Sequence, residues 1–174
     1  GLVGSEMCIR DSVCGILNVT PDSFSDGGCF NNIDAALFHT EEMIKEGASL
    51  IDIGGESTRP GYVMISDDEE IERVIPIIRA VKERFDIPVS LDTYKVGVAE
   101  AGLDAGADMI NDIWGLMYNC ETSDSNVFTS PMAKLLAAAD VPCCLMHNRT
   151  VPEYGDFLSD YLDDNRKIID CALN

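Results

Sequence analysis

The chain has 174 residues, of which 46% are hydrophobic, so it contains enough apolar material for one folded domain with a core. Its formal net charge of −19 at pH 7 excludes a surface built to bind nucleic acid or an anionic membrane. No segment approaches the roughly 20 consecutive apolar residues that a membrane-spanning helix needs. An acidic protein that binds an anionic substrate must neutralise it locally, with arginine side chains, backbone N–H groups or a divalent cation.

The first twelve residues show no helical or strand periodicity and no apolar core like that of a signal peptide. We interpret residues 1–12 as an unmatched segment foreign to the protein, an artefact, and residues 13–174 as its one domain. The chain has seven cysteines, an odd number, without a Cys-x-x-Cys pair. This pattern predicts reduced thiols in the cytoplasm rather than disulfides or a structural zinc site.

From residue 13 onward, short apolar runs alternate with helical patterns, which is typical of β/α units around a parallel sheet. The predicted strands are 14–19, 49–54, 88–92, 108–113 and 142–147. The predicted helices are 33–46, 67–85, 94–105, 132–139 and 157–173. Pro76 predicts a kink in the second helix, or its division into two. The polar stretch 115–131 is predicted to be a connecting loop, an insertion without recognisable chemistry.

These five units predict an α/β fold, an incomplete (β/α)8 barrel in which the first five strands are present. A complete barrel of this kind takes about 250 residues. A doubly wound open sheet is the structural alternative. No Gly-x-Gly-x-x-Gly motif follows the first predicted strand, which disfavours a dinucleotide-binding sheet of that type.

Polar residues stand at the carboxyl end of every predicted strand. In parallel α/β barrels the active site lies at that end of the sheet, so these residues are the candidates for function. The candidates are Asn18, the segment Glu56–Arg59, Asp92 with Thr93, Asn111 with Asp112, and His147–Arg149.

Four motifs at these strand ends match a known family. Residues 18–28 read NVTPDSFSDGG, 52–61 read DIGGESTRPG, 91–93 read LDT and 110–112 read IND. In this order and spacing they closely resemble dihydropteroate synthase, the enzyme of folate biosynthesis that sulfonamides inhibit. The resemblance extends from residue 13 to about residue 174, and its first two motifs are long enough to be highly specific.

The resemblance implies a cytoplasmic, pterin-binding TIM barrel on the pathway to tetrahydrofolate. Such a transferase condenses 7,8-dihydropterin-6-ylmethyl diphosphate with 4-aminobenzoate and releases 7,8-dihydropteroate and diphosphate. Mg²⁺ is the implied cofactor, and the two small molecules are the implied partners. The full-length family member is expected to be a homodimer, which cannot be carried over to this chain.

The resemblance also assigns roles to residues of the first two loops. Asn18 matches the metal position, and its carboxamide oxygen suits a hard cation such as Mg²⁺. Thr58 matches a pyrophosphate contact, and Arg59 can pair with a phosphate or with the aminobenzoate carboxylate. Asn18 could instead only cap the strand–loop turn, and Arg59 could be a solvated surface residue.

The remaining implied roles concern the two rings. Asp92 and Asn111 match the residues that hold the pterin, because a carboxylate can accept two N–H bonds and an amide can both donate and accept. Phe24 and Pro60 match the walls of the aminobenzoate slot, and Met146 packs under the pterin. Two alternatives stay open: Asp92 as a structural link between strands, and Met146 as a core residue.

The implied chemistry needs no covalent intermediate, so catalysis would rest on electrostatics and positioning. The residues expected to be catalytic are Asn18, Thr58, Arg59 and Asp92. We do not assign a general base to His39 or His147. The family's later functional residues, an Asp-Pro-Gly loop, a Lys and an Arg-x-His, are not in this sequence, so the fragment alone is expected to be inactive. The alternatives are a non-catalytic pterin-binding remnant and a pterin-binding methyltransferase domain, which would not need the loops carrying Phe24 and Thr58.

Overall fold

The computed structural model describes residues 12–20, 29–57, 63–119, 121–122, 128–146 and 166. Five strands form the main sheet: β1 (Cys14–Asn18), β2 (Leu50–Gly54), β3 (Val89–Asp92), β4 (Met109–Asp112) and β7 (Cys143–Leu145). The helices are α1 (Cys29–Lys45), α2 (Asp67–Arg84), α3 (Val96–Asp104) and α4 (Pro131–Ala139). Each predicted strand is therefore confirmed. The predicted helix 157–173 lies outside the described residues except at residue 166.

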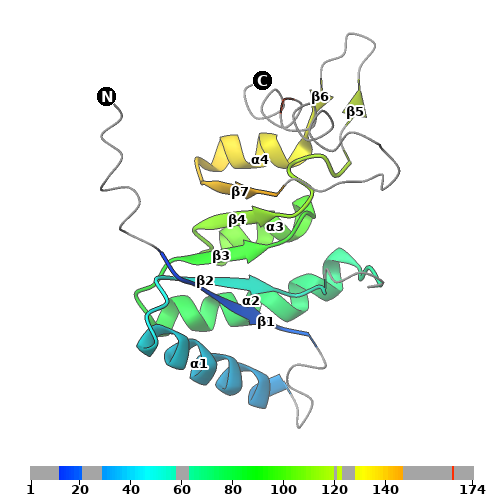
Figure 1. The fold of residues 1–174 in the computed structure, drawn as a ribbon. Helices are drawn as coiled ribbons and strands as arrows, with labels where there is room; N and C mark the ends of the chain where they lie inside the picture. The colour runs from blue at the N-terminus through cyan, green and yellow to red at the C-terminus, as the bar shows by residue number, and fades with distance from the viewer. Residues whose placement is uncertain are drawn as a thin grey trace, which may run out of the picture.

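The main sheet is parallel throughout, and its spatial order is β1-β2-β3-β4-β7, as Figure 1 shows. Strands follow one another across the sheet in the order of the chain. A doubly wound sheet would instead reverse its order at a switch point, so that alternative is wrong. Five parallel strands with helices between them form part of a (β/α)8 barrel.

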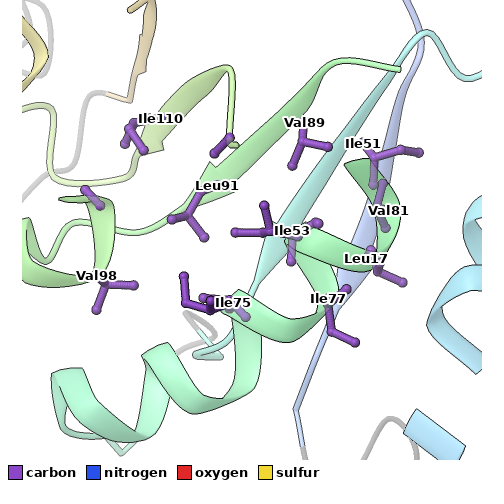
Figure 2. Close-up of a cluster of buried hydrophobic side chains, with 14 of the residues drawn as sticks. Leu17, Ile51, Ile53, Ile75, Ile77, Val81, Val89, Leu91, Val98 and Ile110 are labelled. Atoms are coloured by element: carbon purple, nitrogen blue, oxygen red, sulfur yellow. The ribbon is translucent and has the colours of Figure 1, made fainter. Parts of the chain in front are cut away.

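The helices cover one face of this sheet, and the core lies between the two layers. Every second residue of the central strands packs against the helices, because successive side chains of a strand point to opposite faces. Figure 2 shows this cluster, whose fully buried members include Leu17, Ile51, Ile53, Val89, Leu91 and Ile110 from the strands and Val74, Ile78, Val81 and Val98 from the helices.

Helix α2 is continuous from Asp67 to Arg84, so the division predicted at Pro76 is wrong. Ser66 caps its N-terminus by accepting a hydrogen bond from the Glu69 N–H, and four acidic residues fill its first turn. Buried residues on both sides of Pro76, among them Val74 and Ile78, pack into the core. This packing holds the helix together although proline removes one backbone hydrogen bond.

The loop predicted over 115–131 contains a small second sheet. Strands β5 (Glu121–Thr122) and β6 (Phe128–Thr129) pair antiparallel. The prediction missed them because each strand has only two residues, which is too short for an alternating pattern. Helix α4 follows directly, capped by Ser130 with Pro131 in its first turn. Within the described residues, no helix has the length and apolarity needed to cross a membrane.

Candidate active site

The sheet face that the helices leave open carries a row of polar side chains. Asn18 pairs in register with Gly54, Gly54 with Asp92, and Asp92 with Asn111. Four neighbouring strands therefore bring these residues to one level of the sheet, at the carboxyl end of each strand. The positions of Asn18, Asp92 and Asn111 at the ends of their strands predicted this convergence, and the register confirms it.

Gly54 leaves a gap between two of these oxygen-bearing side chains. A β-carbon added to Gly54 would lie 3.5 Å from Asp92 Oδ2 and 3.6 Å from Asn18 Oδ1. Both oxygens therefore flank the same small space, which glycine leaves open and a larger side chain would fill. Asn18 is exposed and Asp92 is half-buried, so the space opens toward solvent.

One carboxylate that the sequence analysis did not select belongs to the same face. Asp52, on β2, is only 8% exposed, and its Oδ2 accepts a 3.0 Å hydrogen bond from Asn111 Nδ2. Asp52 therefore performs the strand-linking role that was an alternative for Asp92. An acid inside the otherwise apolar strand 50–54, two residues before Gly54 and so on the same face, was the signal that could have revealed it.

Two carboxylate oxygens on this face have no hydrogen-bond partner. Asp52 Oδ1 and Asp92 Oδ1 are both buried, and neither accepts a hydrogen bond from any described residue. A buried acceptor left without a donor costs about 1–3 kcal/mol, so such atoms mark a place where a missing group completes the structure. The missing group must bring N–H or O–H donors or a cation.

The surroundings of Asp92 on this face shift the pKa of its carboxyl group. Burial raises the pKa of Asp92 to about 7, and the charge of nearby Asp52 adds to the effect. A carboxyl group that titrates near neutral pH in a buried site is a frequent property of functional residues. Donors from a ligand would stabilise the ionised form and offset the repulsion from Asp52.

Asp112 faces the helix side of β4 and holds the turn that follows the strand. Its carboxylate is fully buried and accepts 2.8 Å hydrogen bonds from the backbone N–H groups of Trp114 and Leu116. Burial raises the pKa of Asp112 in spite of these bonds. The turn is thereby fixed directly behind Asn111, so Asp112 supports the site without facing it.

Met146 follows β7 at the rim of the open face. Its side chain is 45% exposed, and its backbone N–H donates to the Asp112 carbonyl at 3.0 Å. The alternative that Met146 is a core residue is therefore wrong. An exposed methionine beside the polar row is free to pack against a flat ring.

The donor atoms near Asn18 fit a magnesium ion. Asn18 Oδ1 is a hard oxygen donor beside the space that Gly54 leaves open. Groups of three or more His, Cys, Asp or Glu that could enclose a metal do not occur among the described residues. Mg²⁺ commonly binds through one or two protein oxygens and completes its shell with water and substrate phosphates, so an incomplete protein shell suits it.

Phe24, Thr58, Arg59, Pro60 and His147 lie outside the described residues. His39 is exposed in the middle of α1.

Comparison with known proteins places the chain among pterin enzymes. The model of the family described as "Pterin binding enzyme" matches residues 14–172. A dihydropteroate synthase from Clostridium beijerinckii is 55% identical over 163 residues, which cover 94% of this chain and 57% of that protein. The chain therefore spans little more than half the length of this curated relative.

Solved structures agree in fold as well as in sequence. A dihydropteroate synthase from Clostridium difficile, crystallised in the presence of pteroic acid, matches with a TM-score of 0.83 and 46% identity over 95% of this chain and 59% of that one. The enzyme from Xanthomonas albilineans with 4-aminobenzoic acid matches with a TM-score of 0.80 and 40% identity over 94% of this chain and 56% of that one. These matches, together with the row of polar side chains at the strand ends, show that the chain belongs to the pterin binding enzyme family.

Proposed function

We propose that this chain supplies the pterin-holding face of a dihydropteroate synthase, the transferase that condenses 7,8-dihydropterin-6-ylmethyl diphosphate with 4-aminobenzoate. One observation carries the proposal: Asp52 Oδ1 and Asp92 Oδ1 are buried acceptors without donors, on the face where Asn111 also lies. The aminopyrimidine edge of a pterin offers adjacent N–H donors, which such a face would bind.

Asp92 and Asn111 would hold the pterin from neighbouring strands. The carboxylate of Asp92 accepts two N–H bonds from the ring, and these bonds favour its ionised form. The Asn111 amide donates its N–H to Asp52 at 3.0 Å, which leaves its oxygen to accept from the ligand. Met146, exposed at the rim, would cover one face of the ring.

The other end of the substrate would lie near Asn18. When bound there, Mg²⁺ supplies positive charge that stabilises the departing pyrophosphate. Thr58 and Arg59 follow β2, the neighbour of β1 in the sheet, and would donate to the same phosphates. The chain's own contribution is therefore positioning and electrostatic stabilisation, while the amine of 4-aminobenzoate displaces pyrophosphate from the methylene carbon.

The cytoplasm is the proposed location of this reaction. The three cysteines whose state the structure describes, Cys14, Cys143 and Cys144, are free thiols. Burial raises the pKa of Cys143 to about 12, so this thiol stays protonated and unreactive. Unpaired cysteines agree with a reducing compartment.

Binding by the 174-residue chain tests the pterin face directly. Isothermal titration with pteroic acid is expected to show saturable binding, which Asp92→Asn weakens and the exposed Asp104→Asn does not. Equal binding by the two variants would contradict the assignment of Asp92.

Turnover requires a complete barrel, so the second test uses a chimeric protein. Residues 14–172 would replace the matching part of the Clostridium beijerinckii relative, and release of pyrophosphate would be measured with and without 4-aminobenzoate. The synthase proposal expects release that depends on 4-aminobenzoate and Mg²⁺. Pterin binding without any release would support a non-catalytic pterin-binding protein, and methyl transfer from methyltetrahydrofolate would support a methyltransferase.

A further inference from the structure

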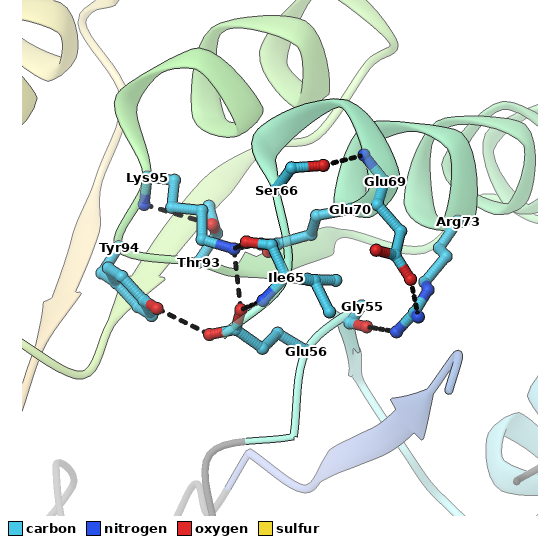
Figure 3. A network of polar contacts seen from close by, with 10 residues as sticks. All are labelled: Gly55, Glu56, Ile65, Ser66, Glu69, Glu70, Arg73, Thr93, Tyr94 and Lys95. Carbon is cyan, nitrogen blue, oxygen red and sulfur yellow. Dashed lines mark hydrogen bonds and ion pairs between the residues drawn. The ribbon is translucent and has the colours of Figure 1, made fainter. Parts of the chain in front are cut away.

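A buried cluster of charges lies beside the proposed site, between the ends of β2 and β3. Lys95 Nζ donates to Glu56 Oε2 and to Glu70 Oε2, both at 2.7 Å, and to the Ile65 carbonyl at 2.8 Å. The side chains of Lys95, Glu56 and Glu70 are 3%, 3% and 1% exposed. Figure 3 shows how these groups converge from different parts of the fold. An ammonium has three N–H donors, so these three partners leave Lys95 with none for a ligand.

Glu56 binds two consecutive residues of the segment 93–95, which directly follows Asp92 at the end of β3. Its Oε1 accepts from the Tyr94 hydroxyl at 2.6 Å, and its Oε2 accepts from the Lys95 ammonium. Tyr94 is itself only 2% exposed. Because Glu56 lies two residues after the end of β2, it ties the backbone that follows Asp92 to the neighbouring strand.

Thr93 completes the fixed segment. Its backbone N–H donates to the Asn111 carbonyl at 3.1 Å, and its hydroxyl oxygen accepts from the Lys95 backbone N–H at 3.3 Å. Lys95 is also the N-cap of α3, where its carbonyl accepts from the Ala99 N–H at 2.9 Å. Hydrogen bonds therefore hold every residue between the end of β3 and the start of α3, to β4 on one side and to Glu56 on the other.

The Asp92 carboxylate depends on this backbone for its direction. Its Oδ1 is buried and accepts no hydrogen bond from any described residue. Asp92 is the last residue of its strand, and the rotamers open to a side chain depend on its backbone angles. A change in the backbone after Asp92 would therefore turn the carboxylate away from the position in which it can accept two N–H bonds from a pterin.

Glu56 and Lys95 are both charged at neutral pH. Burial alone would raise the pKa of Glu56, but hydrogen bonds from Lys95, Tyr94 and Ile65 outweigh it and place the pKa below the ordinary value. Burial alone would lower the pKa of Lys95, but its hydrogen bonds with the two glutamates raise it. The contacts that hold the segment 93–95 are therefore charge-assisted, which makes them stronger than bonds between neutral groups.

A buried ion cluster is a poor choice for stability alone, because well-packed apolar residues of the same volume are often as stabilising or more so. Its benefit is a single geometry, since a binding site is most precise where further hydrogen bonds hold the residues that touch the ligand. We propose that Glu56 is a positioning residue for the pterin, which acts through Tyr94 and Lys95 on the backbone after Asp92 and so aims the Asp92 carboxylate at the ring. This inference rests on the proposed function.

The test compares the binding of two ligands to the 174-residue chain. One is pteroic acid, and the other is the same molecule without its 2-amino group, which lacks one N–H donor of the aminopyrimidine edge. The ratio of the two dissociation constants reports the hydrogen bonds to Asp92 separately from the other pterin contacts. The wild-type chain is expected to prefer pteroic acid about 10–100-fold, the effect of one hydrogen bond to a charged group.

Tyr94→Phe removes the hydroxyl that binds Glu56 and keeps the aromatic ring and every charge of the cluster. It is expected to lower the preference for pteroic acid about fivefold, within the range of coupling between residues of one hydrogen-bond network. Glu56→Ala is expected to lower the preference at least as much. Glu56→Gln is expected to restore part of it, because an amide oxygen can still accept from the Tyr94 hydroxyl.

Tyr118→Phe is the matched control. It makes the same chemical change on a ring that packs edge-on against Tyr94, with 4.6 Å between the ring centroids. Glu56 binds the hydroxyl of Tyr94 and not that of Tyr118. The preference for pteroic acid is therefore expected to stay within about twofold of the wild type, as for independent sites. Thermal unfolding of all the variants shows whether a loss of preference merely follows a loss of stability.

Each outcome has a distinct meaning. If the wild-type chain binds neither ligand, the proposed function fails. If it binds both ligands equally, the Asp92 carboxylate is not aimed at the amino group and the inference is wrong. The positioning role is also wrong if Tyr94→Phe weakens both ligands by the same factor, or if Tyr118→Phe lowers the preference as much as Tyr94→Phe. If Glu56→Ala does not fold, Tyr94→Phe decides, because it leaves the charges of the cluster in place.

Discussion

Asn111 Nδ2 donates a 3.0 Å hydrogen bond to Asp52 Oδ2 across the width of strand β3. The two residues are 59 positions apart in sequence, and β4 and β2 do not pair with each other. The bond turns the nitrogen of the Asn111 amide toward Asp52, so the amide oxygen is the group available to a ligand. Asp52 thus sets the orientation of Asn111, and its charge adds to the rise in the pKa of Asp92 that burial causes.

Replacing Asp52 is therefore expected to change both affinity and pH dependence. Asp52→Ala frees the Asn111 amide to rotate and should weaken pteroic acid binding about tenfold, the effect of one hydrogen bond to a charged group. It also removes the charge that contributes most, after burial, to the raised pKa of Asp92, so that pKa should fall. The pH midpoint of binding, followed by titration calorimetry, should then move below that of the wild type. An unchanged midpoint would show that Asp52 and Asp92 are not electrostatically coupled.

Asp92→Asn should weaken pteroic acid binding about 10–100-fold, because one charge-assisted hydrogen bond contributes about 1.5–3 kcal/mol. The amide that replaces the carboxylate presents an N–H group to a donor of the ligand. Asp104→Asn makes the same chemical change on an exposed residue at the end of α3 and should leave the affinity unaltered. Wild-type affinity in Asp92→Asn would place the pterin elsewhere.

Because the pKa of Asp92 is raised, the free energy of unfolding should change with pH in a definite direction. Its pKa is about 7 in the folded protein against 3.8 ordinarily, so the folded state binds more protons between these values. The free energy of unfolding should then fall as the pH rises from about 4 to 7, with the loss complete above the folded pKa. Asp92→Asn should relieve a cost on the order of 2 kcal/mol at pH 8 and little at pH 4.

Urea unfolding of the wild type and Asp92→Asn at pH 4 and pH 8 measures this difference. Other titrating groups, such as Asp112, are present in both proteins, so their contributions largely cancel in the comparison. If Asp92→Asn is no more stable than the wild type at pH 8, burial and the charge of Asp52 do not destabilise the ionised form of Asp92. Adding pteroic acid should reduce the advantage of the variant, because the ligand stabilises ionised Asp92.

Gly102, buried in α3, determines how closely that helix approaches the sheet. A β-carbon there would lie 2.2 Å from Leu91 Cδ2, and Leu91 is fully buried. Gly102→Ala should therefore destabilise the protein by about 1–3 kcal/mol through overpacking, although alanine favours helices by up to about 1 kcal/mol.

The matched control for this clash is a double variant. Leu91→Val removes the methyl group that alanine would meet, so Gly102→Ala should cost less in the Leu91→Val background than in the wild type. Chemical denaturation measures the four free energies of the cycle. Additive effects would show that the cost of Gly102→Ala does not come from its contact with Leu91.

The pattern of the sequence was sufficient to predict the five parallel strands and the helices between them. Short runs rich in apolar residues, such as 49–54, and amphipathic stretches, such as 67–85, carry this information locally, because strand and helix periods differ. Asn18, Asp92 and Asn111 could also be predicted to share a site, since the carboxyl ends of parallel strands lie at one edge of a sheet. The short hairpin of β5 and β6 depends on pairing and was not predicted. The sequence left open whether Pro76 kinks the second helix or divides it, and packing on both sides of Pro76 keeps α2 continuous.

The sequence by itself determined which chemical groups stand at the strand ends and to which family they belong. Only the tertiary structure decided which role each of these groups has, because hydrogen bonds between strands depend on register and side-chain direction. It assigned the strand link to Asp52 rather than Asp92, and exposed Met146 at the rim of the site. It also brought Lys95 to Glu56, 39 residues away, since the desolvation of buried charges is tolerated only where partners from separate elements meet them.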